Sequence, residues 1–210
     1  MKLSDLRGEY DAIFSLGDLC LASIQLEKYN LRPYAGVLDW MASYNLSDVN
    51  RLLANRFAGF MDYPNLKVVG NASDKLYLVL EQQYNCLSNH DFFTANNFPP
   101  HLAAYPEIKA KYDRRVARFL EKMETADHIL FIRTEGTYEQ ARELEMVLSK
   151  LVKKDFKVLL IQHDPNVVAL MENNWPLRRI CSIQLPGQDK WEGNHYYWEK
   201  ILSGIQLRTS

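Results

Sequence analysis

The stretch YDAIFSLGDLCLASIQLEKYNLRPYAGVLDW, Tyr10 to Trp40, decides how the chain folds. Its apolar run over residues 10–16 is typical of a buried strand, Gly17 and Asp18 predict a turn, and a helix follows whose first turn contains Cys20. Unpaired backbone N–H groups and the positive end of the helix dipole meet at such a point, so the thiol there can have a lowered pKa and act as a nucleophile. The alternative is that Cys20 is a small apolar residue of the core.

Beyond this unit the chain alternates between helices and short apolar strands. Helical spacing of apolar residues predicts helices over residues 43–57, 106–123, 138–153 and about 195–205, and Asp164-Pro165 predicts another helix, with Asp as its cap and Pro at its first position. HILFIR, KVLLIQ and residues 179–185 are continuous apolar runs typical of fully buried strands. This pattern predicts an α/β fold of three layers, a mostly parallel sheet of about four strands with helices on both faces. Residues 60–100 predict a small hairpin insertion.

Size and composition limit the classes of function. With 210 residues and 47% hydrophobic content we expect one domain over residues 1–210. The 25 basic residues nearly balance the 26 acidic ones, which argues against a nucleic-acid partner and a charged membrane anchor. The first residues have no apolar signal segment and no run approaches the length of a membrane span, so we expect a soluble, cytoplasmic protein with no membrane partner.

No cofactor or metal motif is present in the sequence. Neither GxGxxG nor GxxxxGK[ST] occurs, and no His, Cys or carboxylate residues have zinc spacing such as HExxH. The three cysteines, Cys20, Cys86 and Cys181, are widely spaced without a CxxC pair, which fits a reducing compartment. We therefore expect no cofactor and a small-molecule or peptide substrate as the partner, while nothing in the sequence indicates an oligomeric state.

In open parallel sheets, ligands bind beyond the carboxyl ends of the strands. The predicted strands end near Cys20, at Arg133 and at His163-Asp164, so these residues should share one edge. A buried Arg133 needs a partner, either a carboxylate such as Glu135 or Asp39 or an anionic ligand group. His163-Asp164 is interpreted as a strand end followed by a helix cap, or as a base or substrate contact.

Two further features lie outside that edge. His195, at the start of the last helix, is a reserve candidate for a general base. The helix that begins near Pro106 carries many basic side chains on its outer face, which we interpret as a solvated surface. These basic residues are Lys109, Lys111, Arg114, Arg115, Arg118 and Lys122.

Several motifs occur in a recognisable order: SLGDLC, a DW pair at Asp39-Trp40, HDF from His90 to Phe92, YDRRVARF and HILFIRT. Together they resemble a bacterial family described as putative papain-like cysteine peptidases, a domain of unknown function, over residues 10–134 and more loosely to residue 198. The resemblance implies that Cys20 and His90 are the catalytic pair. The usual PFDW of that family is VLDW here, where only Asp39 and Trp40 match.

Two functions of different classes follow. The first is a cysteine-dependent hydrolase or acyl transferase with Cys20 as nucleophile and His90 as general base; Asp164 is the preferred third residue, with Asp91 and Asp39 as alternatives. The second is a non-catalytic binding module that holds an anionic small molecule at the carboxyl ends of the strands. The residues expected to bind substrate are Asp39, Trp40, Arg133, His163 and His195.

Overall fold

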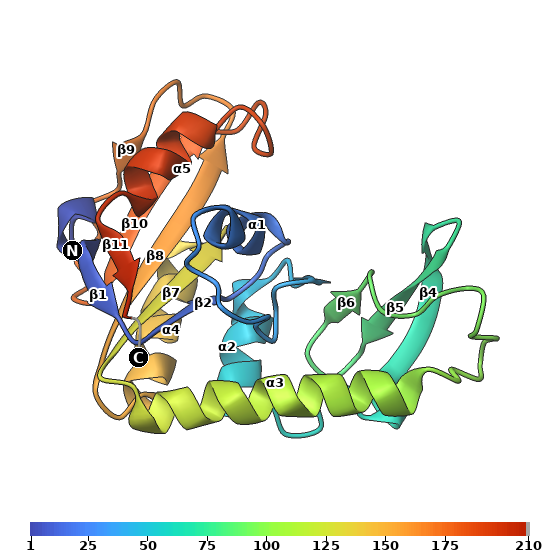
Figure 1. Ribbon diagram of the computed structural model, residues 1–210. Helices are drawn as coiled ribbons and strands as arrows, with labels where there is room; N and C mark the ends of the chain where they lie inside the picture. The colour runs from blue at the N-terminus through green and yellow to red at the C-terminus, as the bar shows by residue number, and fades with distance from the viewer. Residues whose placement is uncertain (209–210) are drawn as a thin grey trace.

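A five-stranded sheet forms the centre of the molecule, as Figure 1 shows for this computed structural model, which describes residues 1–208. Its strand order is β2-β7-β8-β10-β9. The strands are β2 (Ala12–Ser15), β7 (His128–Thr134), β8 (Asp155–Asp164), β10 (Ile180–Pro186) and β9 (Met171–Glu172). The first four are parallel and β9 is antiparallel, at one edge. The predicted α/β fold is confirmed. Strands that are apolar on both faces must be covered on both faces.

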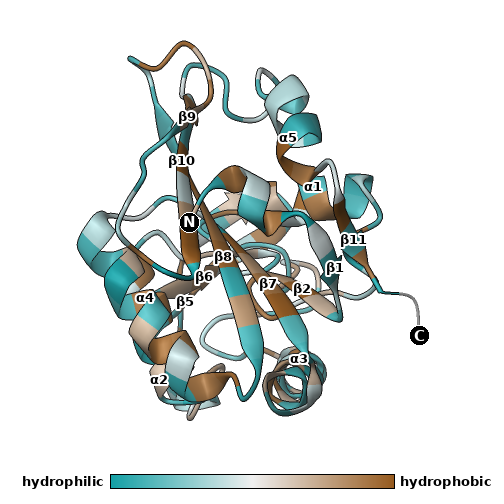
Figure 2. Cartoon of the chain, turned by 90° about the vertical axis from the view of Figure 1, so that its left-hand side faces the viewer, coloured by the Kyte–Doolittle hydropathy of each residue, from teal (hydrophilic) through white to brown (hydrophobic). Residues whose placement is uncertain are grey.

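Helices cover both faces of this sheet (Figure 2). On one face lie α1 (Leu21–Lys28) and α5 (His195–Leu202), and on the other lie α3 (Tyr105–Thr125) and α4 (Tyr138–Leu151), with α2 (Leu46–Ala54) packed against α4. Successive residues of one strand supply opposite cores: Ile13 belongs to the core under α1 and α5, whereas Phe14 belongs to the core under α3 and α4.

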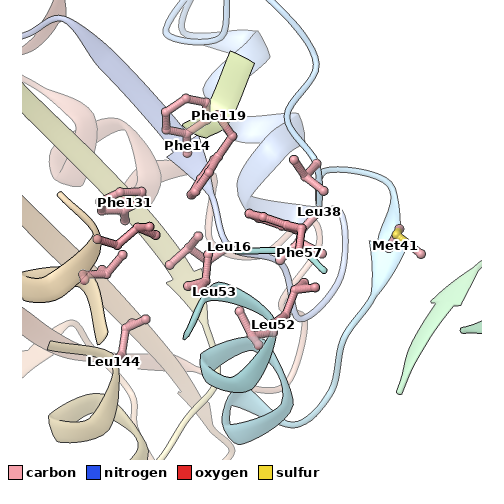
Figure 3. Close-up of a cluster of buried hydrophobic side chains, with 14 of the residues drawn as sticks. Phe14, Leu16, Leu38, Met41, Leu52, Leu53, Phe57, Phe119, Phe131 and Leu144 are labelled. Atoms are coloured by element: carbon pink, nitrogen blue, oxygen red, sulfur yellow. The ribbon is translucent and has the colours of Figure 1, made fainter. Parts of the chain in front are cut away.

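Aromatic rings fill much of the second core (Figure 3). The ring of Phe14 lies 4.8 Å from that of Phe119 on α3, and Phe119 is in turn 5.3 Å from Phe57, which follows α2. Leu53 and Leu144 complete the contact between α2, α4 and the sheet. These contacts fix the direction in which α3 leaves the sheet.

The insertion is a second sheet of four antiparallel strands in the order β3-β6-β5-β4. Its strands are β3 (Met41–Ala42), β6 (Cys86–Ser88), β5 (Leu76–Glu81) and β4 (Leu66–Ser73), and the 3-10 helix η2 (Tyr63–Asn65) directly precedes β4. The insertion expected around residues 60–100 is therefore present, and it recruits β3 from the segment before α2. Figure 1 shows α3 running alongside both sheets, so one long helix joins the two parts.

Both chain ends lie on the side of the first sheet. The 3-10 helix η1 (Leu3–Leu6) precedes β1 (Gly8–Tyr10), which pairs in parallel with β11 (Ile205–Leu207). The strand expected over residues 10–16 is accordingly interrupted: at Asp11 the chain passes from the pairing with β11 to the pairing with β7. The last helix ends at Leu202, earlier than expected, because the chain turns back to form β11.

The helix expected from Asp164-Pro165 is absent from the described chain, so that prediction is wrong. Strand β8 continues through Asp164, and the chain then makes a turn before β9. The Asp164 carboxylate accepts a hydrogen bond from the backbone N–H of Asn166 at 2.8 Å and a second from the side-chain amide of Asn166. Asp followed by Pro and Asn satisfies its side chain within a turn as readily as at a helix start, which explains the error.

Candidate functional site

Cys20 lies immediately before α1, in the turn that follows β2, at the carboxyl end of the sheet. It is partly exposed, whereas Cys86 and Cys181 are 0% exposed within strands. Gly17 adopts a positive φ of 84° in this turn, and a side chain there would collide with Ser43. Glycine is therefore required for β2 to turn into α1 with Cys20 at the helix start.

The turn is held firmly against its surroundings. The backbone N–H of Asp18 donates to the Ser43 hydroxyl at 3.1 Å, and the backbone N–H of Ser43 donates back to the Asp18 carbonyl at 2.7 Å. The Thr134 hydroxyl at the end of β7 donates to the Gly17 carbonyl at 3.1 Å. Cys20 is thus two residues from a fixed anchor, which limits how far its thiol can move.

The expectation of a lowered pKa at Cys20 is wrong. Partial burial raises the pKa of the Cys20 thiol above its ordinary value, and a backbone hydrogen bond only partly offsets this. No side chain of residues 1–208 forms a hydrogen bond with the Cys20 sulfur. Because the sulfur is partly withdrawn from water, burial disfavours the charged thiolate.

His90 lies in the turn after β6, on the insertion, and its side chain is exposed. Its ring meets that of Trp40 edge-on, with ring centres 5.6 Å apart. Neither ring nitrogen of His90 has a hydrogen-bond partner among residues 1–208, so both are available to a substrate. The structure therefore brings His90 and Trp40 together, and no hydrogen bond joins His90 to Cys20.

Asp39 is buried, and its hydrogen bonds hold the segment that carries Trp40 in place. Its carboxylate accepts hydrogen bonds from the Gly36 backbone at 2.7 Å and from Arg32 at 3.0 Å. The Arg32 guanidinium in turn lies 5.5 Å from the ring centre of Trp40. Asp39 and Arg32 thus set the position of Trp40, and through it the wall against which His90 rests.

Asp91, the neighbour of His90 in sequence, is occupied elsewhere. Its buried carboxylate accepts hydrogen bonds from Ser88 at 2.6 Å, from Tyr112 at 2.7 Å and from Lys111. Burial alone would raise the pKa of Asp91, but the hydrogen bonds from Lys111, Ser88 and Tyr112 lower it below its usual value. Asp91 therefore ties the His90 turn to α3.

His163 does have an orienting carboxylate, at the end of β8. Its Nδ1 lies 2.7 Å from the Glu135 carboxylate, its side chain is 4% exposed, and its Nε2 is buried with no partner. Asp164 makes only the turn described above, and His195 contacts Glu192 at 2.9 Å. Within residues 1–208, neither Asp164 nor His195 forms a hydrogen bond with His90 or Cys20.

Arg133 is paired differently from the expectation. Its fully buried guanidinium donates to the backbone carbonyls of Leu16 at 2.9 Å, Ser43 at 2.7 Å and Glu135 at 3.1 Å, and to the Ser43 hydroxyl at 3.0 Å. Burial lowers the pKa of Arg133 to about 10. Neither the Glu135 nor the Asp39 carboxylate is its hydrogen-bond partner. Four of the five N–H donors of Arg133 are used within the protein, so Arg133 fastens the strand end.

Sequence reasoning missed two features at the site. Asp18 is a buried carboxyl at this sheet edge; burial raises its pKa, and Lys190 lies 3.8 Å away. His90 also lines a pocket of about 240 Å³ with side chains of α3 that include Lys111 and Arg114. The spacing of the basic residues on α3 was the only available signal for this pocket. A pocket of about 820 Å³ between Tyr63 and residues 99–102 contains no predicted site residue.

No group of three or more His, Cys, Asp or Glu side chains within residues 1–208 is arranged to hold a metal ion. None of the helices in that same part of the chain combines the length and apolar composition that a membrane span needs.

Comparisons with known proteins show which family the chain belongs to. An uncharacterized protein of Acanthamoeba polyphaga mimivirus is 22% identical over 218 residues, covering 91% of this chain and 97% of the viral protein. No solved structure matches. The family model described as "Putative papain-like cysteine peptidase" matches residues 11–166, which include Cys20, Trp40 and His90. The chain therefore belongs to the family that this model describes.

Proposed function

We propose that the protein is a cysteine-dependent hydrolase of amides, esters or thioesters, with Cys20 as its nucleophile. One observation carries the proposal: Cys20 is the partly exposed cysteine of the three, and it lies at a helix start on the carboxyl edge of the sheet. Backbone N–H groups in the first turn of a helix have no partner within the helix, so they are suited to bind an oxyanion. Membership of the family supports the same assignment.

The raised pKa of Cys20 determines the kind of mechanism. A thiol that is neutral at rest needs a general base at the moment of attack, rather than a preformed thiolate pair. The sulfur attacks the acyl carbon while its proton passes to His90, and the leaving amine, alcohol or thiol takes that proton as the bond to the acyl carbon breaks. Water then attacks the thioester carbon and gives up a proton to His90. The bond from that carbon to the Cys20 sulfur breaks, the acid product leaves, and His90 returns the proton to the sulfur. An acyl transferase would replace that water with another nucleophile.

A short path of contacts supports His90 as the base. The Cys20 turn is hydrogen-bonded through Asp18 to Ser43, and Ser43 lies three residues beyond Trp40, which touches His90. Cys20 and His90 thus flank one segment, residues 39–43. A base must meet the substrate, and the exposed ring of His90 is accessible to it, unlike that of His163. The absence of a direct hydrogen bond is common in free enzymes, where such contacts tighten only with substrate.

His163 is the competing base, because Glu135 already orients it. The two histidines are separated by measuring hydrolysis of activated esters, thioesters and a peptide library by wild type, Cys20→Ala, His90→Gln and His163→Gln. We expect Cys20→Ala to lose about 10³-fold or more in kcat/KM and His90→Gln to lose about 10²–10⁴-fold. Cys181→Ala, a change at a buried cysteine, is the control. Hydrolysis that survives Cys20→Ala would refute the proposal, and a loss confined to His163→Gln would reassign the base.

A further inference from the structure

Four cationic side chains on α3 form one stripe that faces a pocket. Lys111, Arg114, Arg115 and Arg118 are spaced i, i+3, i+4 and i+7, so they lie on the same side of the helix. With Tyr34 and Ala35, from the segment after α1, they line a pocket of about 270 Å³. We call this the basic pocket. All of its charged lining residues are positive, although the chain as a whole has a formal net charge of −1.

The positive charge of the basic pocket is largely uncompensated. Lys111 pairs with the buried Asp91, but Arg114, Arg115 and Arg118 form no ion pair within residues 1–208. Instead, Arg118 lies over the ring of Tyr34 at 4.5 Å and Arg115 over that of Tyr112 at 5.3 Å. Stacking on an aromatic ring holds a guanidinium in place and leaves its N–H donors free for a ligand.

The solvated-surface interpretation does not account for this arrangement. Lys111, Arg115 and Arg118 are only partly exposed, and the stripe brings like charges together at i, i+3 and i, i+4 spacing, which destabilises a helix. An anion with more than one negative charge removes that repulsion. Arginine forks also match the paired oxygens of phosphate groups.

The length of the stripe sets the size of the ligand. Seven helical steps span about 10 Å, enough for one or two phosphate groups and too short to follow a nucleic-acid backbone. We propose that the basic pocket binds the phosphate or pyrophosphate group of a small molecule. This site is separate from the carboxyl edge of the sheet, where the Arg133 guanidinium donates hydrogen bonds to the backbone carbonyls of Leu16 and Ser43.

The basic pocket also adjoins the candidate catalytic site. Lys111 and Arg114 line both this pocket and the neighbouring one that contains His90. A ligand held by its phosphate would therefore extend past Arg114 toward His90. If the proposed hydrolase activity is correct, its substrates carry a phosphate group on the side away from the scissile bond; this last step rests on the proposed function.

Calorimetric titration of the full-length protein with pyrophosphate, inorganic phosphate, glycerol phosphate and citrate tests the site. We expect pyrophosphate binding that weakens at least tenfold in Arg115→Gln/Arg118→Gln and also weakens as salt rises. Arg142→Gln, a change at an exposed arginine on α4 that forms no ion pair in the described chain, should bind as wild type does. Thermal unfolding of each variant verifies that the fold is kept.

Each outcome decides something. No pyrophosphate binding by the wild type, or equal binding by the double variant, would overturn the proposal, and citrate binding as tight as pyrophosphate would overturn its phosphate specificity. Glycerol phosphate binding tighter than inorganic phosphate would indicate an organic phosphate as the ligand, and the reverse would indicate the free anion. Cys20→Ala should bind pyrophosphate unchanged, so failure of the hydrolase proposal would leave this result intact.

Discussion

The carboxyl edge of the five-stranded sheet and the surface around the His90 turn differ in how far their polar side chains are hydrogen-bonded within the protein. At the sheet edge, Arg133 donates four hydrogen bonds to Leu16, Ser43 and Glu135, and His163 contacts the Glu135 carboxylate. Around the turn, both nitrogens of His90 and the guanidinium groups of Arg114, Arg115 and Arg118 have no hydrogen-bond or ion-pair partner within residues 1–208. The comparison teaches that position at a strand end does not by itself make a polar residue functional.

Cys20 stands between these two regions. It belongs to the sheet edge by its place after β2, and it adjoins the other region through Ser43 and Trp40. The proposed site therefore takes its nucleophile from the rigid region and its base from the open one. Substitutions in each region should separate loss of fold from loss of activity.

The largest effect is expected at Arg133. Arg133→Met removes the hydrogen bonds that the guanidinium donates to the buried carbonyls of Leu16 and Ser43 and so loosens the turn after β2. We therefore expect the free energy of unfolding to fall by more than about 4 kcal/mol. Urea denaturation measures this. Arg114→Gln, in the other region, is the matched change and should alter stability by less than about 0.5 kcal/mol. If both substitutions lowered the free energy of unfolding by a similar amount, the two regions would not differ in this way.

The next effect concerns activity at His90. His90→Gln should lower kcat by about 10²–10⁴-fold, because the thiol then lacks a general base, while its stability changes by less than about 0.5 kcal/mol, because the side chain is exposed. Steady-state kinetics and urea denaturation of the same preparation check both halves. Reduced activity accompanied by an equal loss of stability would indicate a structural residue.

Glu81, the last residue of β5, is unlike the exposed His90, because its carboxyl is buried and one of its oxygens has no hydrogen-bond partner within residues 1–208. Burial raises the pKa of Glu81 to about 7 from the ordinary 4.5. The folded state thus holds this proton more tightly than the unfolded chain, so its contribution to stability is present below about pH 4.5 and is lost as the pH rises through 7.

This predicts that Glu81→Gln gains stability relative to wild type as the pH rises. The gain between about pH 5 and pH 8 should be at most about 3 kcal/mol, measured by urea denaturation across that range. Glu199→Gln, at an exposed carboxylate on α5, supplies the baseline. A stability difference that stays constant with pH would show that Glu81 titrates normally.

The smallest effect is expected at His163. His163→Gln removes the contact with Glu135 but keeps a polar side chain of similar size, so we expect a loss of about 1–2 kcal/mol in stability and less than a threefold change in kcat. If His163→Gln instead lowered kcat strongly with little change in stability, His163 and not His90 would be the general base.

The parallel sheet could be predicted because its signal is local: β7, β8 and β10 are apolar on both faces, and the helices α3 and α4 that precede β7 and β8 show helical spacing. The four-stranded sheet was less accessible. Met41 pairs with Ser88 across more than forty residues, and a strand of two residues has no periodicity to detect. The false helix at Asp164 arose because one short sequence satisfies either a cap or a turn.

The site shows a similar division. Cys20 and His90 could be picked from motifs, but the pKa of Cys20 depends on burial, which no local motif shows, and so its direction was mispredicted. The partners of Arg133 are backbone carbonyls, which every residue carries, so no sequence pattern marks them. The basic pocket required Tyr34 to lie against α3, about eighty residues further along the chain.

The most direct test of the central claim is the labelling of native protein by an epoxysuccinyl peptide, read for each cysteine by peptide mass spectrometry. We predict that Cys20 is labelled, that Cys86 and Cys181 are protected by burial, and that His90→Gln slows the labelling of Cys20 by about 10²-fold or more. A Cys20 that reacts no faster than the cysteines of the unfolded chain, or that reacts equally fast without His90, would contradict the proposed catalytic pair.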